Sequence, residues 1–183
     1  MSVPESASTA NKVKAVHDWL KYNCVYSDEG NSMGRESFIS VYGFDPYGSE
    51  GALVQGETVC QGYSQAFMLG MAKLGTPCKM VNSDNHAWNR VYINGSWYNV
   101  DVTWDDSGST DKYFMKSDYY FYSVLGHPAS NTDGIVKRPS KNSDYNYSSW
   151  STYGCSYCHP YVWDFKFATN ACQMGANDFK QLG

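Results

Sequence analysis

The order of apolar and polar residues predicts a one-sided helix near the start of the chain. Its apolar positions recur every three or four residues: Val13, Val16, Leu20 and Cys24. This spacing is the period of an α-helix with one buried face. Ser8 or Thr9 can cap this helix, which should run to about Asn23.

A second helix is predicted from Thr58 onward. Thr58 and Gln61 have the spacing of a capping box, and Gly75 and Pro77 should stop the helix. The positions expected on its buried face are Val59, Tyr63, Ala66, Phe67, Gly70, Met71 and Leu74. Residues 27–57 are rich in glycine and polar residues, so we expect a long connecting segment of the kind that is usually functional.

A β-hairpin is the strongest short-range prediction. Asn94 and Gly95 lie at the centre of residues 87–102, between alternating apolar positions, and both accept the positive φ of a type I′ turn. A two-residue loop places Ile93 opposite Ser96, which fixes the register of the whole hairpin. A short strand over residues 78–82, and a strand with a helix start over 113–122, complete the expected elements, so the fold class is α+β.

Composition narrows the function. The 183 residues fit one domain, and a 16% share of aromatic residues excludes a disordered chain. A net charge of −4 without a basic run argues against nucleic acid as a partner, and no apolar run is long enough to predict membrane insertion. A low charge content with many tyrosines and serines favours a secreted or cell-surface protein.

Three residues combine into a candidate catalytic site. Cys60 falls in the first turn of the second helix, where free N–H groups and the helix dipole stabilise a thiolate. The hairpin register places His86 and Asp101 on the same face as diagonal neighbours, so the carboxylate can orient the imidazole. Cys60 is therefore the candidate nucleophile, His86 the base and Asp101 its orienting acid, and we expect Asp101 not to be a core group.

The same residues resemble a known family. Residues 51–67 (GALVQGETVCQGYSQAF), 86–89 (HAWN) and 97–106 (WYNVDVTWDD) look like the motifs of the bacterial transglutaminase-like, or transglutaminase-core, superfamily. The resemblance covers about residues 10–130, with weaker matches at 17–20, Tyr26, 113–114 and His127. It implies a papain-like fold in which the helix bearing Cys60 packs on an antiparallel sheet carrying His86 and Asp101, and chemistry through a thioester.

The resemblance implies acyl transfer on a protein or peptide substrate, which could belong to the cell surface. Hydrolysis by a cysteine peptidase or amidase is preferred, and the alternatives are glutamine crosslinking or a non-catalytic peptide-binding module of the same fold. Trp88 and Trp104 are expected to line the cleft, and Gln55 is a candidate oxyanion donor. No cofactor, metal or oligomer is expected.

Residues 1–130 are expected to form the catalytic domain, and 131–183 a C-terminal extension packed on it. Cys155 or Cys158 is expected to form a disulfide with Cys172, and a Cys155–Cys158 bridge is the second choice. Zinc or haem binding by these cysteines is a weaker hypothesis. The remaining histidines are expected to be structural or at the surface: His17, His127 and His159.

Overall fold

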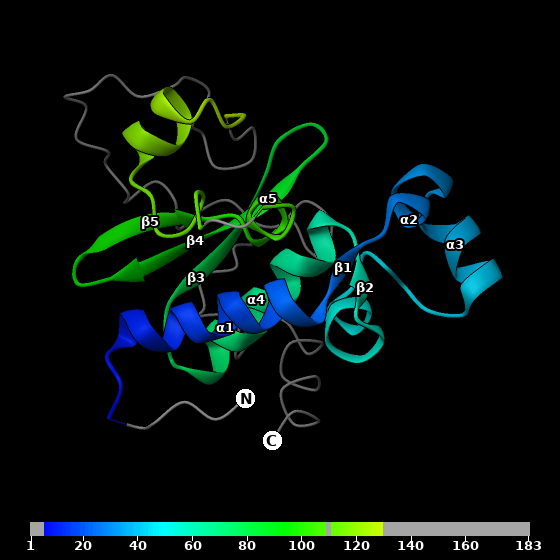
Figure 1. The fold of residues 1–183 in the computed structure, drawn as a ribbon, viewed down its shortest axis with the longest axis horizontal. Helices are drawn as coiled ribbons and strands as arrows, with labels where there is room; N and C mark the ends of the chain where they lie inside the picture. Colours follow the sequence, from blue (N-terminus) through cyan, green and yellow to red (C-terminus); the bar gives the residue numbers. More distant parts are fainter. Residues whose placement is uncertain (1–5, 109–110, 130–183) are drawn as a thin grey trace.

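Two long helices and a three-stranded antiparallel sheet form the centre of the protein, as seen in a computed structural model that describes residues 6–108 and 111–129 (Figure 1). The helices are α1 (Thr9–Asn23) and α4 (Cys60–Lys73). The strands β3 (Cys78–Asn82), β4 (Ala87–Ile93) and β5 (Ser96–Val100) lie side by side in chain order. The α+β prediction is confirmed, and α4 packs between the sheet and α1.

The first helix forms where the sequence predicts it. Ser8 is its N-cap and accepts a hydrogen bond from the Asn11 N–H, and the helix ends at Asn23. The capping box predicted for the second helix is wrong. Thr58 lies in β2 (Glu57–Thr58), and its hydroxyl donates to the carbonyl of Pro46 at 2.7 Å instead of capping α4. The helix begins two residues later, at Cys60.

The segment expected to be a long connection is largely helical. It contains α2 (Asp28–Met33), α3 (Arg35–Tyr42) and a π-helical turn, η1 (Gly51–Gln55), and in Figure 1 α2 and α3 project from the side of the molecule opposite the hairpin. The short β1 (Val25–Tyr26) pairs in parallel with β2. These helices are too short to show a helical period in the sequence, and the many glycine residues of the segment favoured the prediction of a loop instead.

The hairpin has the predicted register. Ile93 pairs with Ser96 and Asn89 with Val100, and the turn residues Asn94 and Gly95 have φ values of 52° and 84°. Because side chains alternate along a strand, this register decides which residues share each face of the sheet. The chain after β5 was not expected to be helical, but α5 (Val102–Asp106) follows at once, with Asp101 as its N-cap.

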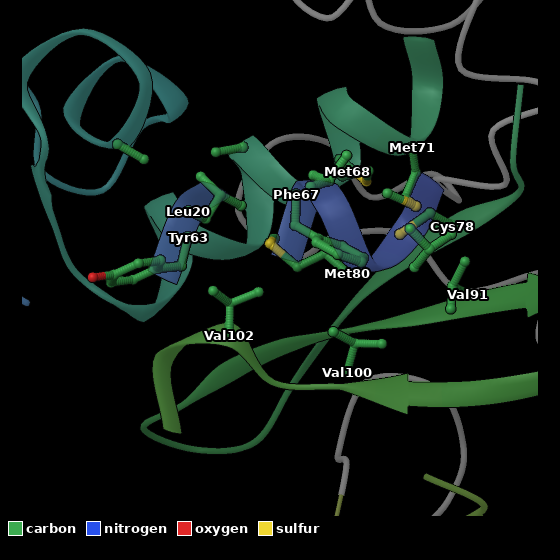
Figure 2. Close-up of a cluster of buried hydrophobic side chains, with 14 of the residues drawn as sticks. Leu20, Tyr63, Phe67, Met68, Met71, Cys78, Met80, Val91, Val100 and Val102 are labelled. Atoms are coloured by element: carbon green, nitrogen blue, oxygen red, sulfur yellow. The ribbon is translucent and has the colours of Figure 1, made fainter. Parts of the chain in front are cut away.

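The main core fills the space between the helices and one face of the sheet. Figure 2 shows side chains of α4 directed toward those of the strands. Its labelled members are Leu20, Tyr63, Phe67, Met68, Met71, Cys78, Met80, Val91, Val100 and Val102.

A smaller apolar cluster covers the opposite face of the sheet. It consists of Val81, Trp88, Phe121 and Tyr122. The last two belong to a second π-helical turn, η2 (Tyr119–Val124), so the predicted helix start in this region is present. The predicted strand is reduced to an antiparallel bridge between Lys116 and Asn99. Both faces of the sheet are thus covered, and the sheet is a buried layer.

Three expectations fall outside the described part of the chain. The extension over residues 131–183 and the pairing of Cys155, Cys158 and Cys172 lie there, as does His159. None of the helices in the described ranges has the length and apolar character needed to span a bilayer.

The first turn of α4 leaves no room for a side chain at Gly62. A Cβ there would lie 1.8 Å from the Thr58 hydroxyl and within 2.8 Å of the carbonyl oxygens of Gly48 and Pro46. We expect Gly62→Ala to lower the free energy of unfolding by about 2 kcal/mol or more, because backbone atoms must move. Urea unfolding measures this. Gly70→Ala is the control, since the three atoms nearest to its Cβ all belong to the Val16 side chain and none to the backbone. A loss at Gly62 equal to or smaller than the loss at Gly70 would contradict this prediction.

Candidate active site

Three elements bring the predicted residues together. Cys60 is the first residue of α4, His86 directly precedes β4, and Asp101 directly follows β5. The His86 Nε2 atom lies 2.6 Å from Asp101 Oδ2, so the diagonal contact expected from the register exists. The Cys60 side chain is hydrogen-bonded to His86. Because Nε2 is engaged by Asp101, Nδ1 is the ring nitrogen that faces the thiol.

Exposure separates Cys60 from the other described cysteines. Cys60 is partly exposed, whereas Cys24 and Cys78 are buried, and all three are free thiols. Burial first, and then the charge of Asp106, raises the pKa of Cys24 to about 12. Burial likewise raises the pKa of Cys78, against hydrogen bonds that lower it. Among these three, only Cys60 is placed to react with a molecule from solution.

The charges of the pair reinforce each other. Burial alone would lower the pKa of His86, but the charge and hydrogen bond of Asp101 and the interaction with Cys60 outweigh it and raise the pKa to about 10. Burial alone would raise the pKa of Asp101, but the neighbouring imidazoles of His86 and His127 lower it to about 2. At neutral pH, His86 is therefore an imidazolium held against an ionised carboxylate.

Asp101 is more deeply placed than the sequence suggested. Its side chain is fully buried, so the expectation that it is not a core group is wrong. Its Oδ1 atom accepts a hydrogen bond from the Trp104 N–H at 3.1 Å, which caps α5. One carboxylate therefore orients His86 and starts the helix that follows the hairpin.

His127 was expected to be a structural or surface residue and is in fact part of the site. It is fully buried, and its Nε2 lies 2.9 Å from the same Oδ2 of Asp101 that His86 contacts. His127 and Asp101 are 26 positions apart in the sequence, so no local spacing rule predicts their contact. Only the weak family match at His127 pointed to it.

His17 forms a second buried histidine–aspartate contact. Its Nε2 lies 3.0 Å from Asp105 Oδ2, and both side chains are fully buried. Asp105 is in α5, and its neighbour Asp106 accepts a 2.5 Å hydrogen bond from the Tyr63 hydroxyl of α4. The two contacts fix α5, and with it Asp101, against both long helices.

The three expected substrate-binding residues differ in position. Trp88 is 1% exposed and packs 4.5 Å from the ring of His127, so it supports the imidazoles from inside and offers a substrate no surface. Its expected place in a cleft wall is therefore wrong. Trp104 is partly exposed and stacks on His86 at 5.2 Å. Gln55 is exposed at the end of η1.

Tyr26 is a further neighbour of the thiol. Burial, and then the negative charges of Cys60, Tyr47 and Asp28, raises its pKa to about 12. Tyr26 pairs with Thr58 in the β1–β2 ladder, two residues before Cys60. The pairing explains how a residue from the start of the chain comes to lie near the candidate nucleophile, Cys60.

The clustered ligand-type side chains do not fit a metal ion. His86, His127 and Asp101 form one such group, but both imidazole nitrogens lie within 2.9 Å of the same oxygen. Ligand atoms of a tetrahedral zinc ion are about 3.3 Å apart, given bonds of about 2.0 Å. This spacing is that of hydrogen bonds.

A second ligand-type group consists of His17, Asp18 and Asp111. Its carboxylates are already paired with Lys14, and Asp111 is also paired with Lys21 at 2.9 Å. The group is therefore an ion-pair network that joins α1 to the segment after α5.

With this geometry described, comparison with known proteins assigns the chain to a class. The family model of the transglutaminase-like superfamily matches residues 2–102, and the chain belongs to that superfamily. The match includes Cys60, His86 and Asp101.

Two particular proteins resemble the chain. It is 25% identical over 191 residues to the kyphoscoliosis peptidase of Mus musculus, a match that covers 85% of this chain and 27% of that protein. A solved structure described as a TGase matches with a TM-score of 0.47 and 21% identity, over 66% of this chain and 32% of that one. The chain thus spans about a third or less of the length of either protein.

The His86–Asp101 pair should make the free energy of unfolding depend on pH in the alkaline range. A folded-state pKa near 10 lies above the ordinary value of 6.5, so the stabilisation is complete below about pH 6.5 and is lost as pH rises through 10. We expect the difference in unfolding free energy between wild type and His86→Gln to shrink between pH 7 and pH 10. Chemical denaturation at several pH values measures it, and a constant difference over this range would rule out the coupling.

Proposed function

We propose that this chain catalyses acyl transfer on protein or peptide amides, with Cys60 as nucleophile, His86 as acid and base, and Asp101 as the residue that orients His86. The proposal depends mainly on one observation, the imidazole of His86 held between the Cys60 thiol and the buried carboxylate of Asp101. Membership of the transglutaminase-like superfamily supports it. A nucleophile, a base and an orienting acid in this order define the logic of a thiol triad.

In the first half-reaction, the Cys60 thiolate attacks the amide carbonyl and a carbon–sulfur bond forms. Cys60 is the first residue of α4, so its backbone N–H can donate to the developing oxyanion. The carbon–nitrogen bond then breaks, and the amine leaves with the proton from His86 Nδ1. This step produces a thioester and a neutral imidazole.

In the second half-reaction, water attacks the thioester. His86 Nδ1 takes one proton from the water, the hydroxyl adds to the carbonyl, and the Cys60 thiolate leaves. The products are a carboxylic acid and the original thiolate–imidazolium pair. If an amine replaces water, the same steps produce a crosslinked amide.

Hydrolysis is the preferred outcome for this chain. Asp105 and Asp106 form the acidic pair that directly follows Trp104 and could attract a lysine amine, but their carboxylates are engaged by His17 and Tyr63 respectively. The name of the mouse relative, a peptidase, also favours hydrolysis. We propose a monomeric, secreted or cell-surface enzyme that acts on protein or peptide substrates, although a peptide-binding module of the same fold is the alternative that an inactive protein would support.

The thiol of Cys60 should react selectively with an electrophile. We expect brief iodoacetamide treatment at pH 6 to label Cys60 and to leave Cys24 and Cys78 unlabelled, because Cys60 is partly exposed and hydrogen-bonded to the His86 imidazole, whereas the other two thiols are buried. Peptide mapping by mass spectrometry gives the site. His86→Gln should lower the labelling rate at pH 6 by at least tenfold, and preferential labelling of Cys24 or Cys78 would contradict the assignment.

The fate of the acyl group can be measured by competition. With casein and a labelled primary amine, we expect new carboxylates from hydrolysis to exceed incorporated amine, because the carboxylates of Asp105 and Asp106 already have partners and are not available to hold an amine cation. Mass spectrometry counts both products, and Cys60→Ala provides the background. Predominant amine incorporation would reverse the preference and assign the chain as a crosslinking enzyme.

A further inference from the structure

The carboxylate of Asp101 serves two imidazoles, of which the proposed reaction uses one. His86 Nε2 and His127 Nε2 both contact Oδ2, at 2.6 and 2.9 Å, while Oδ1 accepts the Trp104 N–H. His127 does not face the thiol, since its other ring nitrogen, Nδ1, lies 3.0 Å from the carbonyl oxygen of Pro128. Its function must therefore be exerted through Asp101.

The contacts of His127 determine how many protons it carries. A carboxylate oxygen and a carbonyl oxygen are both acceptors, so each contact is a hydrogen bond only if the ring nitrogen facing it carries a proton. Both contacts together require a doubly protonated, positively charged ring. The surroundings suit a cation, because the rings of Phe121, Trp104 and Trp88 lie 4.0, 4.4 and 4.5 Å away.

The position of His127 is fixed by the sheet face that also carries Asp101. On that face Asn99 donates to Asp118 at 2.8 Å and accepts from the Tyr122 hydroxyl at 3.1 Å, which holds η2 against β5. The His127 N–H then donates to the carbonyl of Phe121 at 3.2 Å. These hydrogen bonds therefore connect the hairpin, through η2, to the backbone of His127.

We propose that His127 is a positioning residue for the His86–Asp101 pair: it fixes the shared carboxylate and, by donating a charged hydrogen bond to the same oxygen, weakens the hold of Asp101 on the proton of His86. The inference rests on the proposed function, in which His86 must give up its Nδ1 proton in each turnover. A positive charge on His127, whose ring centroid lies 5.5 Å from that of His86, repels the His86 imidazolium, and its hydrogen bond competes with that of His86 for the same oxygen. Without His127, His86 would be a poorer acid toward the leaving amine.

Among residues 6–108 and 111–129, few charged or titratable groups surround His127. Asp101 and His86 face it from the two strand ends, and the phenol rings of Tyr113 and Tyr122 lie 6.1 and 6.2 Å away. The other cation on this face, Arg90, is paired with Asp118 at 2.7 Å. A shift in the titration of His86 on replacement of His127 therefore reports on the shared carboxylate.

The test follows the ring nitrogens of the full chain by NMR, without any turnover. In the wild type, both ring nitrogens of His127 should have the shifts of a protonated imidazole at pH 7, and a neutral tautomer would overturn the proposal. The His127 and His86 signals are assigned by their loss in His127→Gln and His86→Gln. The protonation state of His127 is thus determined in the wild type, and the variants serve only to assign the signals.

The variants then test the effect on His86. We expect the titration midpoint of His86 to rise by about one pH unit or more in His127→Phe, and by less in His127→Gln, whose amide still donates a hydrogen bond. His17→Gln is the matched control, because His17 is equally buried on a carboxylate but contacts Asp105, and the midpoint should stay unchanged. An unchanged or lower midpoint in a folded His127 variant would overturn the proposal.

Measuring kcat and KM of the His127 variants provides a separate test. If the proposed function holds, His127→Phe should lower kcat by about tenfold or more with little change in KM, since proton donation and not binding is impaired. An inactive wild type with the expected NMR shifts would reject the proposed function and keep the arrangement of His127. If the protein is active but the titration midpoint of His86 does not change when His127 is replaced, the proposed function stands and the role of His127 as a positioning residue is rejected.

Discussion

The buried carboxylate of Asp101 is the interaction on which the rest of the site depends. An ionised carboxylate without partners in the interior would cost several kcal/mol, so it must be surrounded by donors. Here three donors surround it: the imidazoles of His86 and His127 and the backbone N–H of Trp104. Each comes from a different segment, and the requirement to satisfy one charge therefore fixes where three segments meet.

The elements around Asp101 act as a frame for it. The type I′ turn at Asn94–Gly95 sets the register that brings the strand ends together, and α5 begins directly at the carboxylate. Behind α5, the contacts His17–Asp105 and Tyr63–Asp106 attach this short helix to α1 and α4. Since α4 also carries Cys60, the proposed nucleophile and the proposed orienting acid, Asp101, belong to one hydrogen-bonded unit, and their distance does not depend on an exposed loop.

The sequence was sufficient where the signal is local. Asn94–Gly95 has only one favourable turn geometry, and from it the contact between His86 and Asp101 follows by counting along two strands. The position of Cys60 in a first turn was also predictable, although the reason was not. Thr58 and Gln61 have the spelling of a capping box, but the Thr58 hydroxyl bonds to Pro46, a partner twelve residues away that no local rule includes.

The sequence was insufficient where long-range contacts decide the structure. His127 and His17 have no neighbour in the chain that identifies their partners, because Asp101 and Asp105 lie 26 and 88 positions away. Trp88 shows the same limit in the opposite direction. An aromatic residue two positions after a candidate catalytic histidine looks like a cleft wall, but η2, whose position depends on Asn99 and Asp118, covers that face and buries it.

The central claim is that Cys60 forms an acyl intermediate with the help of His86 and Asp101. The most direct measurement uses p-nitrophenyl acetate, an acyl donor that requires no knowledge of the natural substrate. Acylation of Cys60 predicts a burst of nitrophenolate of about one equivalent per protein. It also predicts an acetyl group found by mass spectrometry on Cys60 after acid quenching, and loss of both in Cys60→Ala. Nitrophenolate release without acetyl on Cys60, or a burst of the same size in Cys60→Ala, would contradict it.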